Sequence, residues 1–205
     1  MIVIVDYGLG NLGSIHNMLK KIGVHSCISG DRERVADAEK LILPGVGAFD
    51  HGMSNLQAGG LIEVLHRKIL QEETPVLGIC LGMQLLTRTS EEGTLPGLGW
   101  IPGTSRRFRP SFAGQHLPVP HMGWNYVEPA PTSRLFADLP ADPRFYFVHS
   151  YYVDVDDGGD VAARTTYSSS FVSAVERDNV LGVQFHPEKS HKFGMALLRN
   201  FAESY

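Results

Sequence analysis

The residues from 74 to 89 constrain the fold of this 205-residue chain more than any other stretch. Residues 76–79 form an apolar run long enough for one buried strand, and residues 83–88 are good helix formers. Between them lies Gly78-Ile79-Cys80-Leu81-Gly82, a glycine-flanked cysteine of the kind found at a sharp strand-to-helix turn. Such a turn presents Cys80 at the end of a sheet and beside a helix N-terminus, where the thiolate is favoured. The pattern predicts a nucleophilic cysteine, although on its own it also fits a buried structural one.

The first half of the chain alternates short apolar runs with amphipathic stretches. The runs at residues 2–5, 24–28, 41–43 and 76–79 are typical of buried strands, and apolar residues at helical spacing mark residues 13–22 and 61–70. Alternating strands and helices predict a parallel sheet that is covered on both faces. In such a sheet the functional site lies at the carboxyl ends of the strands. The Cys80 turn and the loop Pro44-Gly45-Val46-Gly47 both fall at that edge.

The second half changes character and consists of strand-like pieces joined by Gly, Pro, Ser and Asp turns. These pieces lie at residues 122–127, 145–153, 161–167, 171–176 and 180–185. They predict a mixed or antiparallel extension of the sheet, and a last apolar helix carrying Phe193, Leu197 and Phe201 should return to the core. No linker marks a second domain. We therefore expect one α/β domain over residues 1–205, with a mostly parallel central sheet flanked by helices.

Charge and composition exclude several classes of function. The formal net charge is −4 and no basic block occurs, so nothing supports nucleic-acid binding. No stretch approaches the roughly 18 apolar residues of a membrane span, and the chain starts without signal-peptide character. Cys27 and Cys80 are the only cysteines, so no disulfide framework is expected, and Cys27 fits a small core side chain. These features predict a cytoplasmic protein whose thiols stay reduced.

A glycine-rich loop near the N-terminus supports a rival hypothesis. Gly8-Leu9-Gly10-Asn11-Leu12-Gly13 follows a strand and precedes a helix, and Asp31 lies near the end of the next strand. This is the context of a dinucleotide-binding fingerprint, which would indicate a nucleotide-dependent oxidoreductase. Against it, the chain shows no second mononucleotide-binding half, and a strand-to-helix glycine loop serves any tight turn at the active edge of a sheet.

A cysteine nucleophile requires a histidine near a strand end and a carboxylate that orients it. Among nine histidines His186 fits best, because residues 180–185 form a strand and Pro187 turns the chain so that Glu188 can reach back to the imidazole. His149 is the competitor, but no acidic residue follows it until Asp154. No histidine pair shows metal-ligand spacing, so we expect no metal and no cofactor.

At this point the motifs resemble a known family, the triad (class I) glutamine amidotransferases, whose triad is Cys-His-Glu. The resemblance runs from Asp6 to Ser190 with no departure at a motif position. It is carried by the motifs Asp6-Tyr7-Gly8-Leu9-Gly10-Asn11-Leu12, Pro44-Gly45-Val46-Gly47, Gly78-Ile79-Cys80-Leu81-Gly82-Met83-Gln84, Pro120-His121-Met122-Gly123-Trp124-Asn125, His149-Ser150-Tyr151 and His186-Pro187-Glu188-Lys189-Ser190. The Met-Gly-Trp-Asn and Glu-Lys-Ser pieces are similar to the branch that serves imidazole glycerol phosphate synthesis.

The resemblance implies four groups of site residues. They are catalytic Cys80, His186 and Glu188; oxyanion-hole donors at Val46, Gly47 and Leu81; glutamine-binding Gln84, His149, Ser150 and Tyr151; and a partner interface at Asn11, Trp124, Asn125 and Lys189. Without the resemblance, Trp124 fits an ordinary core tryptophan and Lys189 a solvated lysine.

The resemblance further implies the reaction and the partner. Glutamine would be hydrolysed to glutamate and ammonia, and ammonia would pass to a separate (βα)₈-barrel synthase subunit in a heterodimer that serves histidine biosynthesis. That partner would release imidazole glycerol phosphate and an aminoimidazole carboxamide ribotide. Two alternatives stay open. One is an amidotransferase that feeds a chorismate or pyridoxal enzyme, and the other is a stand-alone cysteine hydrolase or chaperone-like protein built on the same turn.

Overall fold

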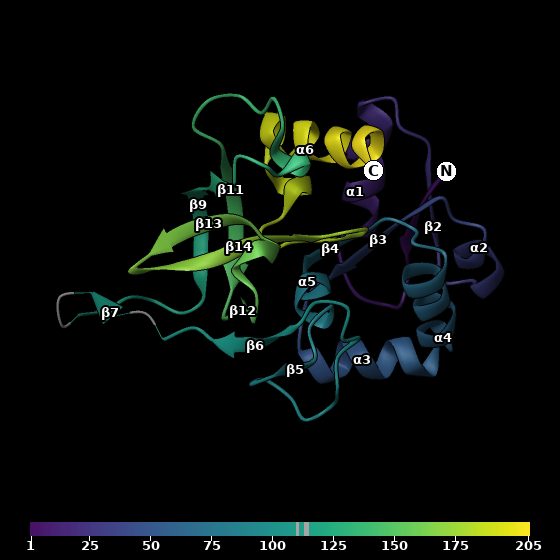
Figure 1. Ribbon diagram of the computed structural model, residues 1–205, viewed down its shortest axis with the longest axis horizontal. Helices are drawn as coiled ribbons and strands as arrows, with labels where there is room; N and C mark the ends of the chain where they lie inside the picture. Colours follow the sequence, from purple (N-terminus) through teal and green to yellow (C-terminus); the bar gives the residue numbers. More distant parts are fainter. Residues whose placement is uncertain (110, 113–114) are drawn as a thin grey trace.

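Apolar residues on both sides of consecutive strands determine where the core forms. The computed structural model describes residues 1–109, 111–112 and 115–205 (Figure 1). Successive side chains of a strand point to opposite faces, so Val3 and Leu41 enter one core while Ile4 and Ile42 enter the other. Both faces are therefore apolar, which is why the strands read as unbroken hydrophobic runs.

The central sheet confirms the predicted architecture. Its parallel part has the order β2 (Ser26–Ser29), β1 (Ile2–Val5), β3 (Lys40–Gly45), β4 (Val76–Cys80) and β15 (Val180–Val183). The sheet continues through β14 (Ser169–Arg177), β12 (Tyr151–Val155), β6 (Gly103–Arg107) and β5 (Thr89–Ser90), with β13 (Val161–Tyr167) and β10 (Glu128–Pro129) pairing off this path. The pairs β15–β14, β14–β12 and β12–β6 are antiparallel.

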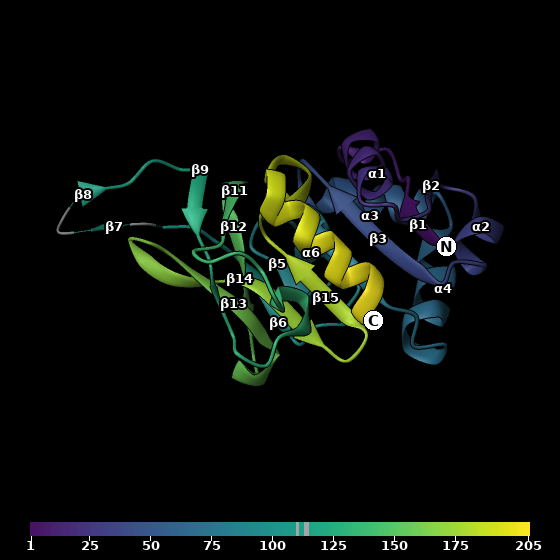
Figure 2. The same ribbon diagram turned by 90° about the horizontal axis from the view of Figure 1, so that it is seen from above.

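Helices cover both faces of the parallel part, as Figures 1 and 2 show. On one face lie α1 (Leu12–Lys21) and α6 (His191–Ser204). On the other lie α2 (Arg32–Ala36), α3 (Phe49–Ala58), α4 (Leu61–His66), which runs on into the π-helix η1 (Arg67–Gln71), and α5 (Leu81–Leu85). Short 3₁₀ helices are η2 (Arg134–Phe136), η3 (Gly158–Asp160) and η4 (Pro187–Lys189).

A separate two-stranded ribbon packs beside the antiparallel part of the sheet. It consists of β9 (His121–Tyr126) and β11 (Arg144–His149), and a small hairpin of β7 (Ser111–Phe112) and β8 (Gln115–His116) projects at the left of Figure 1. The sequence predicted one strand over residues 145–153, and this was wrong. The chain bends at Ser150, whose carbonyl accepts a hydrogen bond from the Phe108 N–H at 2.8 Å, and passes from β11 into β12. Apolar content cannot reveal such a bend, because both strands are strand-like.

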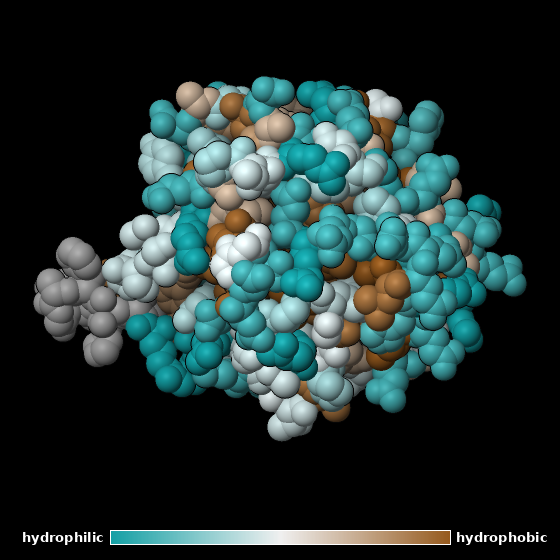
Figure 3. Space-filling view, in the orientation of Figure 1, coloured by the Kyte–Doolittle hydropathy of each residue, from teal (hydrophilic) through white to brown (hydrophobic). Residues whose placement is uncertain are grey.

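Two helices were missed in the sequence. Helix α2 lies within a charged segment and is capped by Asp31, whose side chain accepts a hydrogen bond from the Arg34 N–H at 2.9 Å. Helix α3 buries Phe49, Met53 and Leu56 at helical spacing, although Gly52 interrupts the pattern. In the described part of the chain, every helix is too short or too polar to cross a membrane. The face shown in Figure 3 is mostly hydrophilic, with apolar atoms in small groups.

Candidate active site

Cys80 lies at a strained turn between β4 and α5. Its backbone has φ 56° and ψ −109°, which a residue with a side chain adopts only when its surroundings impose it. Glycines on both sides are required by close backbone contacts: a Cβ on Gly82 would lie 1.8 Å from the Leu43 carbonyl oxygen, and one on Gly78 would lie 2.8 Å from the Gly82 backbone. The turn therefore holds the sulfur at the carboxyl edge of the sheet and at the N-terminus of α5.

The loop after β3 lies beside the sulfur. In the parallel register of β3 and β4, Gly45 is paired with Cys80, so residues 46 and 47 extend past the nucleophile. Val46 is 44% exposed, and Gly47 has φ +107°, which glycine alone adopts readily. The Tyr7 hydroxyl donates a 2.5 Å hydrogen bond to the Pro44 carbonyl. Burial, and then the nearby Cys80, raise the pKa of Tyr7, which keeps the phenol protonated as a donor.

The glycine-rich loop of residues 8–13 supports this strand. A Cβ on Gly10, which has φ +109°, would lie 3.1 Å from the Pro44 Cβ, so the loop packs directly on the strand next to the nucleophile. Gly13, in contrast, has no neighbouring atom within 4 Å of an added Cβ. The third glycine of a dinucleotide fingerprint exists for close helix–strand packing. The packing of this loop therefore does not follow the dinucleotide pattern.

His186 and Glu188 form a buried pair at the end of β15. Glu188 Oε1 lies 2.8 Å from His186 Nδ1, and both side chains are 2% exposed. The backbone of His186 is held by β11, because its N–H donates to the Tyr146 carbonyl at 2.9 Å. The other ring nitrogen, Nε2, is buried and has no hydrogen bond of ordinary geometry within the described residues. It is therefore available to a group in the cavity that it shares with Cys80.

The charge of His186 depends on its neighbours. Burial lowers its pKa, but the nearby Cys80 and the hydrogen-bonded Glu188 outweigh this effect and raise the pKa to about 9. The imidazole is therefore held as the imidazolium at neutral pH, facing the sulfur and backed by the carboxylate. An imidazolium in this position can donate a proton to a group that is bound in the cavity.

A cavity of about 280 Å³ joins the residues that the sequence predicted as a site. Its lining includes the predicted residues Val46, Gly47, Cys80, Leu81, Gln84, His149, Ser150, Tyr151 and His186. Glu188 is not among the lining residues and contacts the site through His186. Across the described residues, no group of three or more His, Cys, Asp or Glu could hold a metal ion.

Three residues of the lining were missed in the sequence, namely Glu92, Pro120 and Val148. Glu92 is the one carboxylate among the described residues of the lining, and its Oε2 accepts a hydrogen bond from the Phe49 N–H at the start of α3 at 2.8 Å. A carboxylate held in this way can bind a cationic group of a ligand. Its only sequence signal is an acidic pair, Glu91-Glu92, after the helix that follows Cys80, and such pairs are common on surfaces.

The side chains of Gln84 and His149 already make hydrogen bonds within the protein, which the sequence did not predict. Gln84 uses both amide hydrogens within the protein: Nε2 donates to the Tyr151 carbonyl at 3.1 Å and to Gln184 Oε1 at 3.2 Å. Its carbonyl oxygen is the group that it can offer to a ligand. His149 is hydrogen-bonded to the Tyr151 carbonyl at 2.8 Å and to His121 at 2.9 Å. Burial, above all, lowers the pKa of His149 to about 3, so its ring is neutral.

Two of the predicted partner residues, Trp124 and Lys189, lie beside the same ring, that of Tyr146 in β11. The Trp124 ring is stacked on His191 with centroids 5.6 Å apart and is 6.4 Å from the Tyr146 ring, and Lys189 Nζ lies 5.6 Å from the same Tyr146 ring. Trp124 is 46% exposed, with Met122 at 61% and Tyr126 at 57% on the same side of β9. The tryptophan is thus an exposed residue and not a core residue.

Asn11 is exposed at the start of α1, and Asn125 is hydrogen-bonded within the fold. Strand side chains alternate, so Asn125 points to the opposite side of β9 from Trp124. Its Nδ2 donates to the Thr166 carbonyl at 2.9 Å and contacts His121 Nε2 at 3.2 Å, and its Oδ1 accepts from the Tyr126 N–H at 2.8 Å. Asn125 therefore does not share the outward surface of Trp124.

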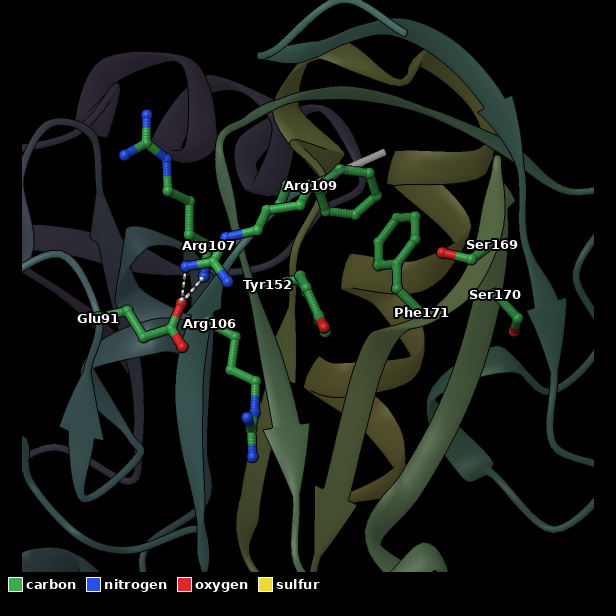
Figure 4. Close-up of a pocket in the computed structure, with 9 residues that line it drawn as sticks. Glu91, Arg106, Arg107, Arg109, Tyr152, Ser169, Ser170 and Phe171 are labelled. Atoms are coloured by element: carbon green, nitrogen blue, oxygen red, sulfur yellow. Dashed lines mark hydrogen bonds and ion pairs between the residues drawn. The ribbon is translucent and has the colours of Figure 1, made fainter. Parts of the chain in front are cut away.

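A second cavity of about 220 Å³ contains charged residues but no nucleophilic sulfur (Figure 4). Arg106, Arg107 and Arg109 border it together with Glu91. The Glu91 carboxylate accepts a hydrogen bond from the Arg107 backbone N–H at 2.8 Å and lies 3.8 Å from the Arg109 guanidinium. This carboxylate neutralises part of the arginine charge.

Comparisons with known proteins identify the family of the chain. The family model "Glutamine amidotransferase class-I" matches residues 3–204. The chain is 55% identical over 201 residues to imidazole glycerol phosphate synthase subunit HisH 2 of Methanococcus maripaludis, with 98% of both proteins covered. It is 51% identical over 203 residues to subunit HisH 2 of Pseudomonas aeruginosa, with 99% of both covered.

Solved structures support the fold. A glutamine amidotransferase crystal structure has a TM-score of 0.74 at 20% identity and covers 98% of this chain and 97% of its own. PurLQS of Thermotoga maritima has a TM-score of 0.70 at 19% identity and covers 98% and 95%, respectively. At such identities these structures establish the fold alone, whereas the match of nearly the whole chain at 51–55% identity establishes the family. The chain therefore belongs to the class I glutamine amidotransferases and, within them, to the HisH subunits of imidazole glycerol phosphate synthase.

Proposed function

We propose that this chain hydrolyses glutamine to glutamate and ammonia with Cys80, His186 and Glu188 as its triad. The observation that carries this proposal is the buried His186, which is held by Glu188 on one nitrogen and turns the other toward the cavity of Cys80. An amide is a weak electrophile, so a thiolate is needed for attack. The imidazolium beside the sulfur can supply the proton without which ammonia cannot leave.

The reaction runs through a thioester. The Cys80 sulfur bonds to the amide carbon, and the carbonyl oxygen becomes an oxyanion that backbone N–H groups of Leu81 and of residues 45–47 stabilise. As the C–N bond breaks, His186 gives its proton to the departing ammonia. His186 then takes a proton from water, whose oxygen attacks the thioester. The C–S bond breaks, the sulfur leaves as the thiolate beside the imidazolium of His186, and glutamate is released. Glu188 holds the ring in one tautomer and stabilises its positive charge.

The substrate is held by charge and hydrogen bonds. We assign the α-ammonium group of glutamine to Glu92, a carboxylate of the cavity lining, because an opposite charge recognises it there. The Gln84 carbonyl oxygen and the backbone of residues 149–151 contribute polar contacts. A reduced thiol is essential, and the cytoplasm keeps thiols reduced, so we place the reaction there.

The partner follows from the relatives, which are named subunits of imidazole glycerol phosphate synthase. We propose that the chain forms a heterodimer with a (βα)₈-barrel cyclase subunit, which consumes the ammonia. The outward surface of β9 with Trp124, together with Lys189, supports a docking site near the cavity mouth. Tryptophan is enriched where binding energy concentrates in interfaces.

The test is a glutaminase assay with the purified chain, with and without the cyclase subunit. We expect glutamate to form in the presence of the partner, in an amount equal to the product that the cyclase subunit makes from the released ammonia. Glutamate release that is equal without the partner would instead favour a stand-alone hydrolase. A chain that releases no glutamate under either condition would contradict the proposed activity.

A further inference from the structure

A row of polar groups, half-buried at Asn125 and buried at His121 and His149, runs from strand β9 toward the nucleophile. Asn125 Nδ2 lies 3.2 Å from His121 Nε2, His121 Nδ1 lies 2.9 Å from His149 Nε2, and His149 Nδ1 lies 2.8 Å from the Tyr151 carbonyl oxygen. His121 is 3% exposed and His149 5% exposed. The glutaminase chemistry proposed above does not use the side chains of this row.

Backbone groups at both ends of the row determine which atom donates and which accepts in each hydrogen bond. A carbonyl oxygen only accepts, so His149 Nδ1 carries a proton and its Nε2 is the acceptor for His121 Nδ1–H. At the other end, Asn125 donates to the Thr166 carbonyl and accepts from the Tyr126 N–H, which fixes the orientation of its amide. Asn125 therefore donates to His121 Nε2, and the proton of His121 again lies on Nδ1. Both ends require the same tautomers.

The row continues to the sulfur through two glutamines. The Tyr151 carbonyl also accepts from Gln84 Nε2, which donates in turn to Gln184 Oε1. Gln184 is completely buried, and its Nε2 lies 3.8 Å from Cys80 Sγ. An N–H aimed at sulfur stabilises a thiolate, since hydrogen bonding to the charged form favours that form. Each hydrogen bond of the row thus fixes the position of the next group.

Aromatic rings exclude water from the histidine pair. The His121 ring is stacked on Phe147 at 4.8 Å and on Tyr167 at 4.2 Å, and Phe171 lies 5.2 Å from His149. In such surroundings a broken hydrogen bond cannot be replaced by water, so a buried donor or acceptor left alone is costly. The row is therefore rigid, and it tolerates one proton arrangement.

We propose that His121 and His149 are positioning residues of the active site. With both rings neutral and protonated on Nδ1, they hold the Tyr151 carbonyl at the cavity wall and thereby orient Gln84 and Gln184, whose amide proton stabilises the Cys80 thiolate. This inference rests on the proposed glutaminase function. Its tests include two readouts that need no glutamine, so its failure can be told apart from a failure of that function.

The first test is kinetic and uses a matched set of variants in complex with the cyclase subunit. His121→Phe keeps the ring but removes both hydrogen bonds, whereas His121→Asn keeps a donor near the Nδ1 position. We expect His121→Phe to lower kcat by about tenfold with KM little changed, on the scale of one buried hydrogen bond, and His121→Asn to recover most of the loss. Thr165→Val, a buried polar deletion on neighbouring β13, should leave kcat unchanged.

The second test measures alkylation of Cys80 by iodoacetamide in the isolated chain, with Cys27 of the same molecule as reference. We expect His121→Phe and Gln184→Leu to slow Cys80 and not Cys27. The third test reads the histidine tautomers of the wild type by ¹⁵N NMR at pH 7, which depends on no variant. An Nε2–H tautomer at His121 or His149 overturns the proposal, and so do wild-type kcat and alkylation rates in His121→Phe.

Discussion

The charge of His186 is set by the two groups on either side of its buried ring, Cys80 and Glu188. Burial alone lowers the pKa of His186, yet Cys80 and Glu188 raise it to about 9. Since this value exceeds the roughly 6.5 of an unfolded histidine, folding takes up a proton. The stabilisation by this imidazolium is complete below pH 6.5 and is lost as the pH rises through about 9.

Cys80→Ser should abolish glutamine hydrolysis and leave the fold intact. The change is nearly isosteric, and an alcohol is a far weaker nucleophile than a thiolate here. The complex should still form product when ammonia is supplied directly. Cys27→Ser is the control and should cost some stability and little activity; substantial glutamine-dependent turnover in Cys80→Ser would disprove the assignment.

Glu188→Gln should lower kcat strongly with a smaller effect on KM, because the amide no longer stabilises the imidazolium. Glu188 is one of the groups that raise the pKa of His186, so the pH at which the ring loses its proton should fall below about 9. Histidine NMR across about pH 5–10 measures that shift. Glu203→Gln, on the surface of α6, is the control, and an unaltered kcat would remove Glu188 from the triad.

Glu92→Gln should raise KM for glutamine by about tenfold or more and change kcat little, since it removes one charge that binds the substrate in both ground and transition state. The glutamine oxygen can still accept the hydrogen bond from the Phe49 N–H, so α3 should keep its start. Steady-state kinetics of the complex decide this, and an unchanged KM would place the α-ammonium elsewhere.

At the scale of elements, α5 approaches β3 so closely that position 82, in the first turn of α5, admits only glycine. A Cβ on Gly82 would lie 1.8 Å from the Leu43 carbonyl oxygen, and this contact is between backbone atoms that cannot rotate away. The contact with β3 thus holds Cys80 in its strained backbone conformation. The loop that follows the same strand carries Val46 and Gly47. Nucleophile and predicted oxyanion donors share one rigid support.

Gly82→Ala should therefore destabilise the chain by several kcal/mol, at the upper end of single-substitution effects (about 4 or more). Gly13→Ala in α1 is the matched control, because its Cβ would meet no atom within 4 Å; alanine there should be neutral or stabilise by about 0.5 kcal/mol. Urea unfolding of both variants measures the difference. Equal stabilities would refute the close packing.

At the scale of the whole molecule, the site and the predicted docking surface lie at the same edge of the sheet. The carboxyl ends of the parallel strands carry the cavity, and the β9–β11 ribbon beside it exposes Trp124. Lys189 directly follows the Glu188 that holds His186, so a contact made by Lys189 acts on the residue next to a predicted triad member.

Trp124→Ala and Lys189→Ala should leave the isolated chain folded and weaken its stimulation by the cyclase subunit. Leu70→Ala is the control, since Leu70 is 60% exposed but lies on η1, ahead of β4 and away from the cavity. Glutaminase rate against cyclase concentration measures the effect, with circular dichroism as the folding check. Wild-type titration curves for both variants would exclude this surface as the interface.

The sequence by itself determined the features that depend on neighbours along the chain. The apolar runs defined the parallel strands, the glycines around Cys80 defined the turn, and Pro187 brought Glu188 back to His186, because each requires contacts over only a few residues. The tertiary structure alone decided the register that sets Gly45 beside Cys80 and the bend at Ser150.

The tertiary structure also decided which side chains meet across the fold. Gln184 reaches Cys80 from 104 residues away, Glu92 enters the cavity from a loop tied to α3, and Asn125 turns inward while its neighbour Trp124 turns out. No local pattern encodes these contacts, because they follow from which strands pair and in which register. The motif residues line the cavity because they lie at the ends of strands. The hydrogen bonds that orient them are made by residues of strands that are distant in the sequence.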